Sequence, residues 1–334
     1  MRAAVVQGLG KPLAVETIAD PTPGMGELVV KVGRCGICGS DLHMSDDEAF
    51  GVGAGDVLGH EFAGEVVAIG KGVDHIRAGD LVSVIPIRGC GECASCREGE
   101  PAWCARGMLL QGGGYAEYAL TTAGQCVALP KTASLADGAL VEPLAVALHG
   151  VRLSGLKKGD KILVLGAGPI GLAVAFWARR LGASAIVVQD VADHQRERAM
   201  TLGASRFIVD RADPVGAAER ALGGKADIVF ECVGLPGLIA QAVDQVRTKG
   251  TVLILGLCTK PDTLIPFVAL SKEARLQTSA FFTRSDYETA LDALNAGSAE
   301  PRALITDTIP LDAVPTTFEG LKHRTHQCKV MIAP

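Results

Sequence analysis

The sequence predicts an α/β protein with two domains: a β-rich domain and a Rossmann domain built on a doubly wound parallel sheet. Up to about residue 130, short apolar runs are separated by Gly, Pro and Asp, which is typical of strands joined by turns. From Lys157 onward, apolar runs alternate with helical segments, which is the pattern of a parallel sheet covered by helices. A chain of 334 residues is also long for a single core.

Each strand expected in the second half is a short apolar run. We expect strands at 161–165, 185–189, 206–209, 227–230, 251–255 and 274–280. Helices between them often end at glycine, as at Gly182 and Gly203, because a left-handed residue commonly closes a helix. A further helix is expected from Ser134 in spite of Pro143. After about residue 283 the chain should return to the first domain.

Composition and charge argue against several function classes. The net charge is −5 and the isoelectric point is near 5.8, so we expect no nucleic-acid partner and no membrane surface. The longest uncharged stretch, 162–178, contains three glycines and a proline, which indicates strand–turn–helix rather than a membrane span. The N-terminus lacks the apolar core of a signal peptide. With ten cysteines, this favours a reducing, cytoplasmic location.

Four cysteines stand at C-x2-C-x2-C-x7-C spacing: Cys90, Cys93, Cys96 and Cys104. Tetrahedral zinc needs four thiolates at about 2.3 Å, and a short loop with these steps can surround the ion. Because all four positions are then taken by protein, we predict a structural zinc. Iron–sulfur spacing would end in C-x3-C-P, which this loop does not. Two disulfides fit the count, but nothing else indicates export.

The motif GAGPIG lies between an expected strand and an expected helix, and in this context G-x-G-x-x-G indicates a dinucleotide site. Its glycines allow a tight turn, approach of a pyrophosphate and close helix packing, and the helix N-terminus faces the diphosphate. Asp190 ends the next strand, where its carboxylate would bind ribose hydroxyls and repel a 2′-phosphate. We therefore predict NAD rather than NADP. The expected cofactor contacts are Gly166, Gly168, Pro169, Ile170, Gly171 and Asp190.

A second group of metal ligands lies upstream, in RCGICGSDLH and GHEFAG. Cys38 offers a thiolate, His60 offers an imidazole, and a carboxylate such as Glu61 would complete the set. A catalytic zinc needs about three protein ligands and one open position. The sequence therefore predicts two zinc ions per chain, one structural and one catalytic.

Several motifs then occur in a characteristic order: GICGSDLH, GHEFAGEVVAIG, the four-cysteine loop, GGYAEY, EPLAVALH and GAGPIG. In this the chain resembles the zinc-dependent medium-chain dehydrogenase/reductase family, closest to its sorbitol, threonine and butanediol dehydrogenase-like branch. The resemblance implies a GroES-like catalytic domain over 1–148 and 284–334, with a structural zinc lobe at about 88–106. It also implies a Rossmann NAD-binding domain over 149–283 and a homodimer or homotetramer.

The resemblance makes Cys38 and His60 ligands of the catalytic zinc and leaves two candidates for the third. Where liver-type alcohol dehydrogenases carry a second cysteine, this chain has Glu142, and in the family Glu61 also lies beside the metal. Zinc is expected to act as a Lewis acid on the substrate hydroxyl. Ser40 would accept the proton, and the resemblance continues this relay to His43.

We therefore predict an NAD-dependent zinc alcohol dehydrogenase that converts a secondary alcohol or a vicinal diol into the ketone. Polyol dehydrogenases of the family carry an Arg-Tyr pair where this chain has Phe282 and Thr283, which argues against a sugar polyol. A threonine- or polyol-type dehydrogenase and an NAD(P)H-dependent ketone or aldehyde reductase stay open as alternatives. So does a zinc-free quinone reductase or structural protein on the same fold. The acidic charge opposes a zinc-ribbon nucleic-acid-binding protein.

Overall fold

The computed structural model describes residues 1–323 and 326–334, which form two compact units. Unit 1 contains Met1–Glu142, Thr283–Ser298 and Ile305–Pro334, and unit 2 contains Pro143–Phe282 and Ala299–Leu304. The chain therefore leaves unit 1 after Glu142 and returns at Thr283, whereas the boundaries expected from the sequence follow residues 148 and 283. Those domain boundaries stay predictions.

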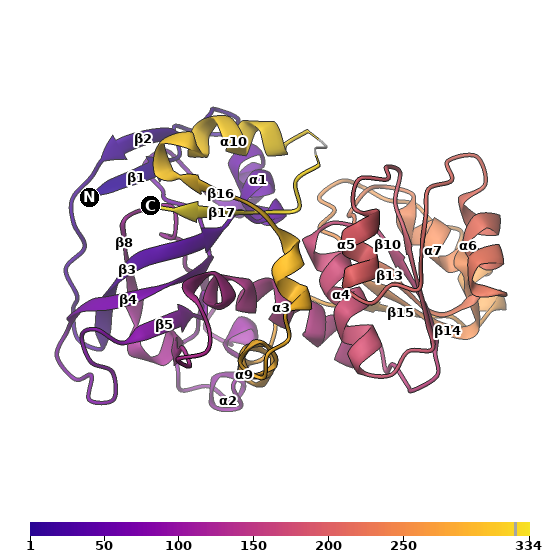
Figure 1. The fold of residues 1–334 in the computed structure, drawn as a ribbon, viewed down its shortest axis with the longest axis horizontal. Coiled ribbons are helices and arrows are strands. Elements are labelled where there is room, and N and C mark those ends of the chain that lie inside the picture. The colour runs from indigo at the N-terminus through magenta and orange to yellow at the C-terminus, as the bar shows by residue number, and fades with distance from the viewer. Residues whose placement is uncertain (324–325) are drawn as a thin grey trace. The chain divides into compact units, whose positions relative to one another are not determined.

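Unit 2 is built on a six-stranded sheet whose neighbouring strands are all parallel (Figure 1). Its strands are β10 (Lys161–Leu165), β11 (Ala185–Gln189), β12 (Arg206–Ile208), β13 (Ala226–Glu231), β14 (Val246–Ile254) and β15 (Arg275–Thr278). Their order, β12-β11-β10-β13-β14-β15, is the 3-2-1-4-5-6 order of a Rossmann fold. Helices cover both faces of such a sheet, so residues such as Leu163, Val187 and Val229 are buried, and this explains the apolar runs.

The helices of unit 2 connect these strands. They are α4 (Pro169–Arg180), α5 (Arg196–Thr201), α6 (Pro214–Leu222), α7 (Leu238–Gln245) and α8 (Pro266–Ser271). Gly182 and Gly203 follow α4 and α5 with φ of 96° and 101°, as the closing glycines predict. Strand β14 begins at Val246, five residues before the predicted start at 251. Val246 pairs with Ala226, and after a register shift the pairing resumes at Thr251 with Ile228, so the strand also includes residues 247–250.

Unit 1 contains a seven-stranded sheet centred on β3 and β4 (Figure 1). Its strands are β3 (Glu27–Gly36), β4 (Glu61–Ile69), β5 (Leu81–Val84), β8 (Tyr118–Thr122), β9 (Cys126–Ala128), β16 (Ile305–Pro310) and β17 (Lys329–Ala333). One edge of β3 pairs with β8 through its first half and with β17 at its last residues, while β4 pairs along the whole strand. The end of the chain therefore lies beside the end of β3.

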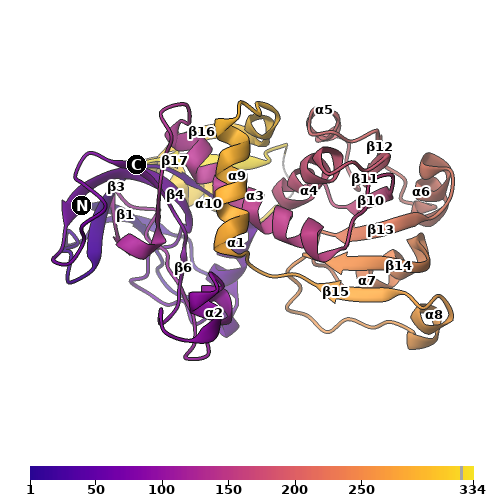
Figure 2. The same cartoon turned by 90° about the horizontal axis from the view of Figure 1, so that it is seen from below.

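Smaller elements complete unit 1 (Figure 2). Strands β1 (Arg2–Val5) and β2 (Ala14–Thr17) form an antiparallel pair, and β6 (Ile87–Arg88) pairs with β7 (Leu109–Leu110). The helices are α1 (Gly39–Asp46), α2 (Ala94–Arg97), α9 (Arg284–Asn295) and α10 (Val314–Leu321), and α3 (Leu135–Leu153) contains the unit boundary. Single 3-10 turns are η1 (Glu48–Phe50), η2 (Pro101–Trp103), η3 (Ala123–Gln125), η4 (Glu300–Leu304, in unit 2) and η5 (Leu311–Ala313). The helix expected from Ser134 through Pro143 is thus present.

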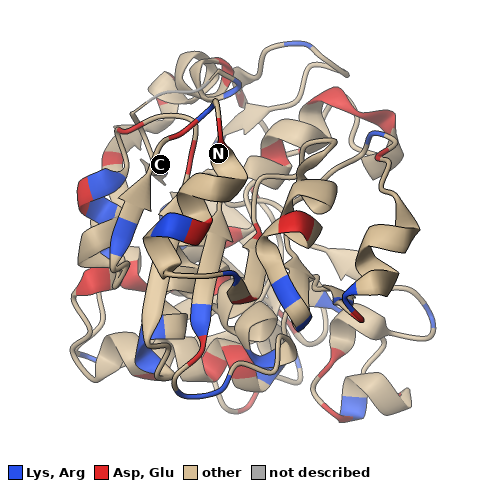
Figure 3. Ribbon diagram, turned by 90° about the vertical axis from the view of Figure 1, so that its right-hand side faces the viewer, with Lys and Arg blue, Asp and Glu red and all other residues tan. Residues whose placement is uncertain are grey.

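Charged residues of both signs are interspersed along the elements in Figure 3 rather than gathered by sign. Many of them pair, as Arg220 does with Asp213 and Arg247 with Asp227. Within residues 1–323 and 326–334, the helices fall short of the length and apolar character that crossing a membrane requires.

Candidate metal and dinucleotide sites

The ends of two paired strands bring the candidate catalytic ligands together. Gly36, the last residue of β3, lies opposite Glu61, the first residue of β4. Cys38 follows β3 by two residues and His60 precedes β4 by one, so both stand at the same end of the pair. Cys38 is also the N-cap of α1, and its backbone N–H donates to the Asp41 carboxylate at 3.1 Å. The strand ends and the helix start therefore fix the sulfur and the imidazole locally.

Three donor atoms converge at this point. The ligand atoms of Cys38, His60 and Glu61 all lie within 4.8 Å of one another. Ser40 lies among them, because its Oγ is 3.1 Å from Cys38 Sγ and 3.4 Å from His60 Nε2. His60 therefore directs Nε2 toward the cysteine, while its other nitrogen is engaged elsewhere. A thiolate, an imidazole and a carboxylate form a donor set that zinc takes readily.

Asp41 fixes the orientation of the His60 ring. Its Oδ1 lies 3.1 Å from His60 Nδ1, and its Oδ2 accepts a hydrogen bond of 2.6 Å from the Tyr115 hydroxyl. Burial raises the pKa of Asp41, but the charge of His60 and the hydrogen bonds outweigh it, so the net pKa is lowered. Burial lowers the pKa of His60, yet Asp41 and Cys38 raise it well above its usual value. The surroundings of His60 thus favour a positive charge on its ring or next to it.

Glu61 is paired with a buried lysine. Lys329, the first residue of β17, places Nζ 2.7 Å from both carboxylate oxygens of Glu61 and 3.0 Å from the Ile37 carbonyl oxygen. Both side chains are at most 1% exposed. Burial lowers the pKa of Lys329, but the charges of Glu61 and Cys38 raise it by more than burial lowers it. The net pKa is therefore raised. The lysine is therefore a permanent cation beside the candidate metal ligands.

Glu142, on α3, is buried near this group but lies outside the set of donor atoms within 4.8 Å of one another. The net pKa of Glu142 is raised to about 7: burial is the largest cause, the charges of Glu61 and Asp41 also raise it, and those of His60 and Lys329 lower it. Three buried carboxyls, of which Glu142 has a raised pKa, and the Cys38 thiol thus gather around one ammonium group and the His60 imidazole. Because buried charge needs compensation, the group as a whole fits a divalent cation.

His43 is placed differently from the other candidates. It lies on α1, three residues after Ser40, and its side chain is exposed. Its backbone oxygen accepts a hydrogen bond from Asp47 at 3.0 Å. The structure therefore brings Ser40 to the donor atoms and leaves His43 on the surface of the same helix, where its role in a proton relay stays a prediction.

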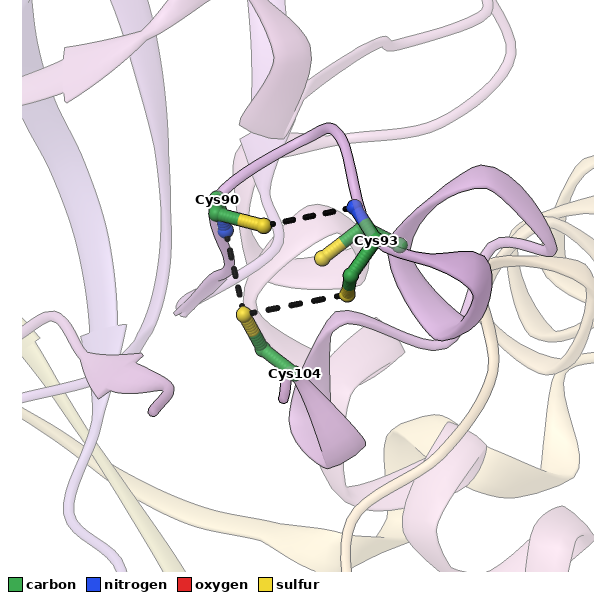
Figure 4. A group of neighbouring side chains, drawn as sticks. Cys90, Cys93 and Cys104 are labelled. Carbon is green, nitrogen blue, oxygen red and sulfur yellow. Dashed lines mark hydrogen bonds between the residues drawn. The ribbon is translucent and has the colours of Figure 1, made fainter. Parts of the chain in front are cut away.

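The four-cysteine loop folds its sulfurs together (Figure 4). The ligand atoms of all four lie within 4.8 Å of one another, and Cys93 Sγ is 4.0 Å from Cys104 Sγ. Zinc–sulfur bonds of about 2.3 Å in a tetrahedron place sulfurs about 3.8 Å apart, so the loop fits one ion. A Cβ on Gly89 would meet Cys96 Sγ at 2.4 Å, so this backbone must stay free of a side chain.

Backbone N–H groups point at the sulfurs of this loop. The N–H of Cys90 donates to Cys104 Sγ at 3.3 Å, and the N–H of Cys93 donates to Cys90 Sγ at 3.4 Å. Hydrogen bonds from backbone N–H groups, with one from Cys96, lower the pKa of Cys93 to about 6. Burial raises the pKa of Cys96 to about 11. The loop thus already stabilises a thiolate, the form in which cysteine binds zinc.

The three glycines of GAGPIG have the three roles that the motif predicts. Gly166 adopts a left-handed φ of 95° in the turn after β10. Gly168, the N-cap of α4, is exposed, and a Cβ added there would meet nothing within 4 Å. A Cβ on Gly171 would lie 2.0 Å from the Gly166 oxygen, so only glycine permits this helix–strand approach. The start of α4 is therefore open to an anion such as a diphosphate.

Asp190 connects this loop to the end of β11. Its Oδ2 accepts from the Ala167 N–H at 2.8 Å, and its Oδ1 accepts from the N–H groups of Val191 and Ala192 at 2.6 and 3.2 Å. These bonds hold the carboxylate beside the glycine-rich turn, at the place where an acidic residue would contact a ribose.

Two family models match the sequence. The alcohol dehydrogenase GroES-like domain matches residues 24–131, and the zinc-binding dehydrogenase domain matches residues 169–296. The (R,R)-butanediol dehydrogenase of Bacillus subtilis is 33% identical over 338 aligned positions, which cover 97% of this chain and 97% of that protein. The chain belongs to the zinc-binding alcohol dehydrogenase family. This confirms the resemblance and the fold class that the sequence predicts.

Other proteins are similar to this zinc-binding dehydrogenase over its whole length. The sorbitol dehydrogenase of Bacillus subtilis is 29% identical over 347 aligned positions, covering 100% of this chain and 97% of that protein. The crystal structure of a Sinorhizobium meliloti 1021 protein bound to NADP is similar with a TM-score of 0.89 and 31% identity, covering 100% of this chain and 99% of that one. The family resemblance thus extends to both units.

Sequence reasoning missed the partners of the candidate ligands. Tyr115 is 74 residues from Asp41, and Lys329 is 268 residues from Glu61. The first pairing had a weak signal, because Tyr115 follows the three glycines of GGGYAEY. The second could have been found only by placing the C-terminal strand beside β3.

Proposed function

We propose that the protein is an NAD-dependent zinc alcohol dehydrogenase that oxidises a secondary alcohol or a vicinal diol to the ketone. The observation that carries this proposal is the convergence of the half-buried Cys38 with the buried His60 and Glu61, a donor set that suits one divalent cation. Its family includes the butanediol and sorbitol dehydrogenases described above. When bound, zinc supplies a Lewis acid that polarises the substrate oxygen.

We assign the third protein ligand to Glu61 rather than to Glu142. The Glu61 carboxylate belongs to the set of mutually close donor atoms, and Lys329 holds it there through two hydrogen bonds. Glu142 interacts electrostatically with His60 and Glu61, but it does not belong to that set of mutually close donor atoms. The four cysteines of the loop leave no open position, so their zinc has a structural role.

Ser40 is the proposed acceptor of the substrate proton, because its hydroxyl lies 3.1 Å from Cys38 Sγ and 3.4 Å from His60 Nε2. We expect Ser40→Ala to lower kcat by about a hundredfold, the lower end of general acid–base effects, without loss of zinc. Ser45→Ala is the matched control, since Ser45 lies on the same helix and donates to the Leu42 carbonyl oxygen at 2.8 Å. Near-normal turnover of Ser40→Ala in steady-state kinetics would remove Ser40 from the mechanism.

The preference for NAD is assigned to Asp190, although a related structure contains NADP. A carboxylate about 4 Å from a 2′-phosphate is repelled by a few kcal/mol, so its removal should relax the preference. We expect Asp190→Ser to lower the ratio of kcat/KM for NAD to that for NADP by at least about tenfold, which corresponds to about 1.4 kcal/mol. Asp193→Ser, which removes a surface partner of Arg196, should leave the ratio unchanged.

The positions where polyol dehydrogenases of the family carry an Arg-Tyr pair bear on the substrate. Phe282 is 1% exposed and Thr283 caps α9 by accepting from the Asp286 N–H, so both side chains have structural roles. This favours a secondary alcohol or diol over a sugar polyol. A panel of secondary alcohols, vicinal diols and polyols with NAD, and of the ketones with NADH, tests substrate and direction together. Activity that survives removal of both zinc ions by a chelator would favour a zinc-free reductase instead.

We also propose that the protein assembles with a second copy through the β15 edge of its Rossmann unit. Strand β15 lies at one edge of the sheet and pairs only with β14 within the described residues (Figure 2). Ile265, Phe267 and Leu270, at the start of α8 or within it, are each at least 69% exposed. An open strand edge next to an apolar surface is usually covered. Sedimentation velocity of the purified protein measures whether it is a dimer or a tetramer.

A cytoplasmic location belongs to the same proposal. The ten cysteines form no disulfide within the described residues, and seven of them are either proposed sulfur ligands of zinc or other buried thiols. Such thiols persist where the surroundings keep them reduced. Fractionation of cells that produce the protein, with the thiols counted before and after reduction, tests this location.

A further inference from the structure

We propose that Tyr115 is a positioning residue for the zinc site, acting on His60 through Asp41. The inference rests on the proposed function, because it takes His60 as a zinc ligand. Tyr115 is 0% exposed, and its hydroxyl donates to Asp41 rather than to a proposed zinc ligand.

Asp41 accepts hydrogen bonds from both of its neighbours, Tyr115 and His60. The Tyr115 hydroxyl donates to Asp41 Oδ2 at 2.6 Å, and Asp41 Oδ1 lies 3.1 Å from His60 Nδ1. A carboxylate only accepts, so it fixes a proton on Nδ1 and leaves the Nε2 lone pair for a metal. Without the hydroxyl, Asp41 Oδ2 would keep only the longer bond, of 3.1 Å, from the Cys38 N–H.

The phenol itself is held in place by the segment that carries His60. Its ring packs so closely on Gly59 that a Cβ there would lie 2.3 Å from the ring, and the Tyr115 N–H donates to the Leu58 carbonyl oxygen at 3.0 Å. Phe318 contacts the ring edge-on, with the centroids 6.3 Å apart. The hydroxyl therefore has a fixed position relative to Asp41, and it can hold the carboxylate at one angle.

Outer hydrogen-bond partners of a metal-bound histidine typically change metal affinity by 10- to 100-fold. Tyr115 lies one step beyond Asp41, so we expect the lower end of this range. Tyr115→Phe keeps the ring and its packing, and it should weaken zinc binding at the Cys38–His60 site by about tenfold.

The chain offers a matched control. Tyr287 is also 0% exposed in unit 1, and its hydroxyl donates to the Val84 carbonyl oxygen at 3.1 Å and lies 2.5 Å from Ser83 Oγ. Tyr287→Phe removes a buried phenol hydroxyl just as Tyr115→Phe does. Both variants should lower the melting temperature of the zinc-depleted protein, but only Tyr115→Phe should weaken zinc binding at the Cys38–His60 site.

The experiment is competition for zinc between the full chain and a chromophoric chelator, supported by the visible spectrum of the cobalt-substituted protein. Tyr115→Phe should lower the affinity for the more readily removed zinc ion and shift the cobalt spectrum. In an Asp41→Ala background, the same substitution should not change the zinc affinity further. Equal zinc affinities for Tyr115→Phe and Tyr287→Phe would overturn this inference alone. A wild-type protein that holds zinc only on the four cysteines would overturn the proposed function as well.

Discussion

Cys38→Ala is expected to reduce the zinc content from two ions to one and to abolish measurable alcohol oxidation. The sulfur is one of the three convergent donors, and its loss leaves an imidazole and a carboxylate that Lys329 already engages. Without the ion, the substrate oxygen loses several kcal/mol of transition-state stabilisation. About 4 kcal/mol corresponds to about a thousandfold in rate. Metal analysis and steady-state kinetics on the same preparation measure both effects.

Cys35→Ala is the control for this experiment. Cys35 is a buried thiol three residues earlier, inside β3, and its sulfur donates to the Gly36 carbonyl oxygen. The sulfur also packs against Gly59, as the Tyr115 ring does. Its loss removes a small core side chain and no expected ligand, so both zinc ions should stay. A Cys38→Ala protein that still contains two zinc ions, or that keeps its turnover, would show that the open site lies elsewhere.

The Rossmann unit could be predicted from the sequence almost strand by strand, and the reason is physical. The inner strands of this parallel sheet are buried on both faces, so each of them is a nearly continuous apolar run such as 161–165. The three glycines of GAGPIG are required by the backbone, so their roles also follow from the sequence. The start of β14 was missed because residues 247–250 are polar or glycine and separate Val246, which pairs with Ala226 of β13, from the predicted run at 251–255.

At the candidate metal site, the sequence predicts the ligands but not the residues that hold them in place. Cys38, His60 and Glu61 carry recognisable chemistry, but their partners depend on contacts between distant segments. Lys329 reaches Glu61 because β17 pairs with the end of β3, and no local pattern announces a buried lysine in a C-terminal strand. The choice between the two glutamates likewise depended on distances, which a sequence does not contain.

Loss of the other zinc should damage structure rather than chemistry. In Cys104→Ala we expect one zinc per chain, rapid proteolysis within residues 90–104 and a lower melting temperature, while the folded fraction keeps the Cys38–His60 ion. The loop has little else to hold it: no residue of α2 or η2 is buried, and Trp103 and Leu109 are 43% and 53% exposed. In small metal domains, zinc contributes about 10–16 kcal/mol to folding, far more than this loop gains by packing.

Cys126→Ala separates the loss of zinc from the loss of a thiol. Cys126 is buried in β9, outside the loop, where its sulfur contacts the Thr122 carbonyl oxygen at 3.5 Å. Its removal should cost some stability through packing but leave the zinc content at two and the loop resistant to limited proteolysis. If Cys104→Ala kept two zinc ions and the wild-type cleavage pattern, the four sulfurs would not share an ion. Their convergence would then reflect packing of the loop alone, and the zinc content would have to be explained by other residues.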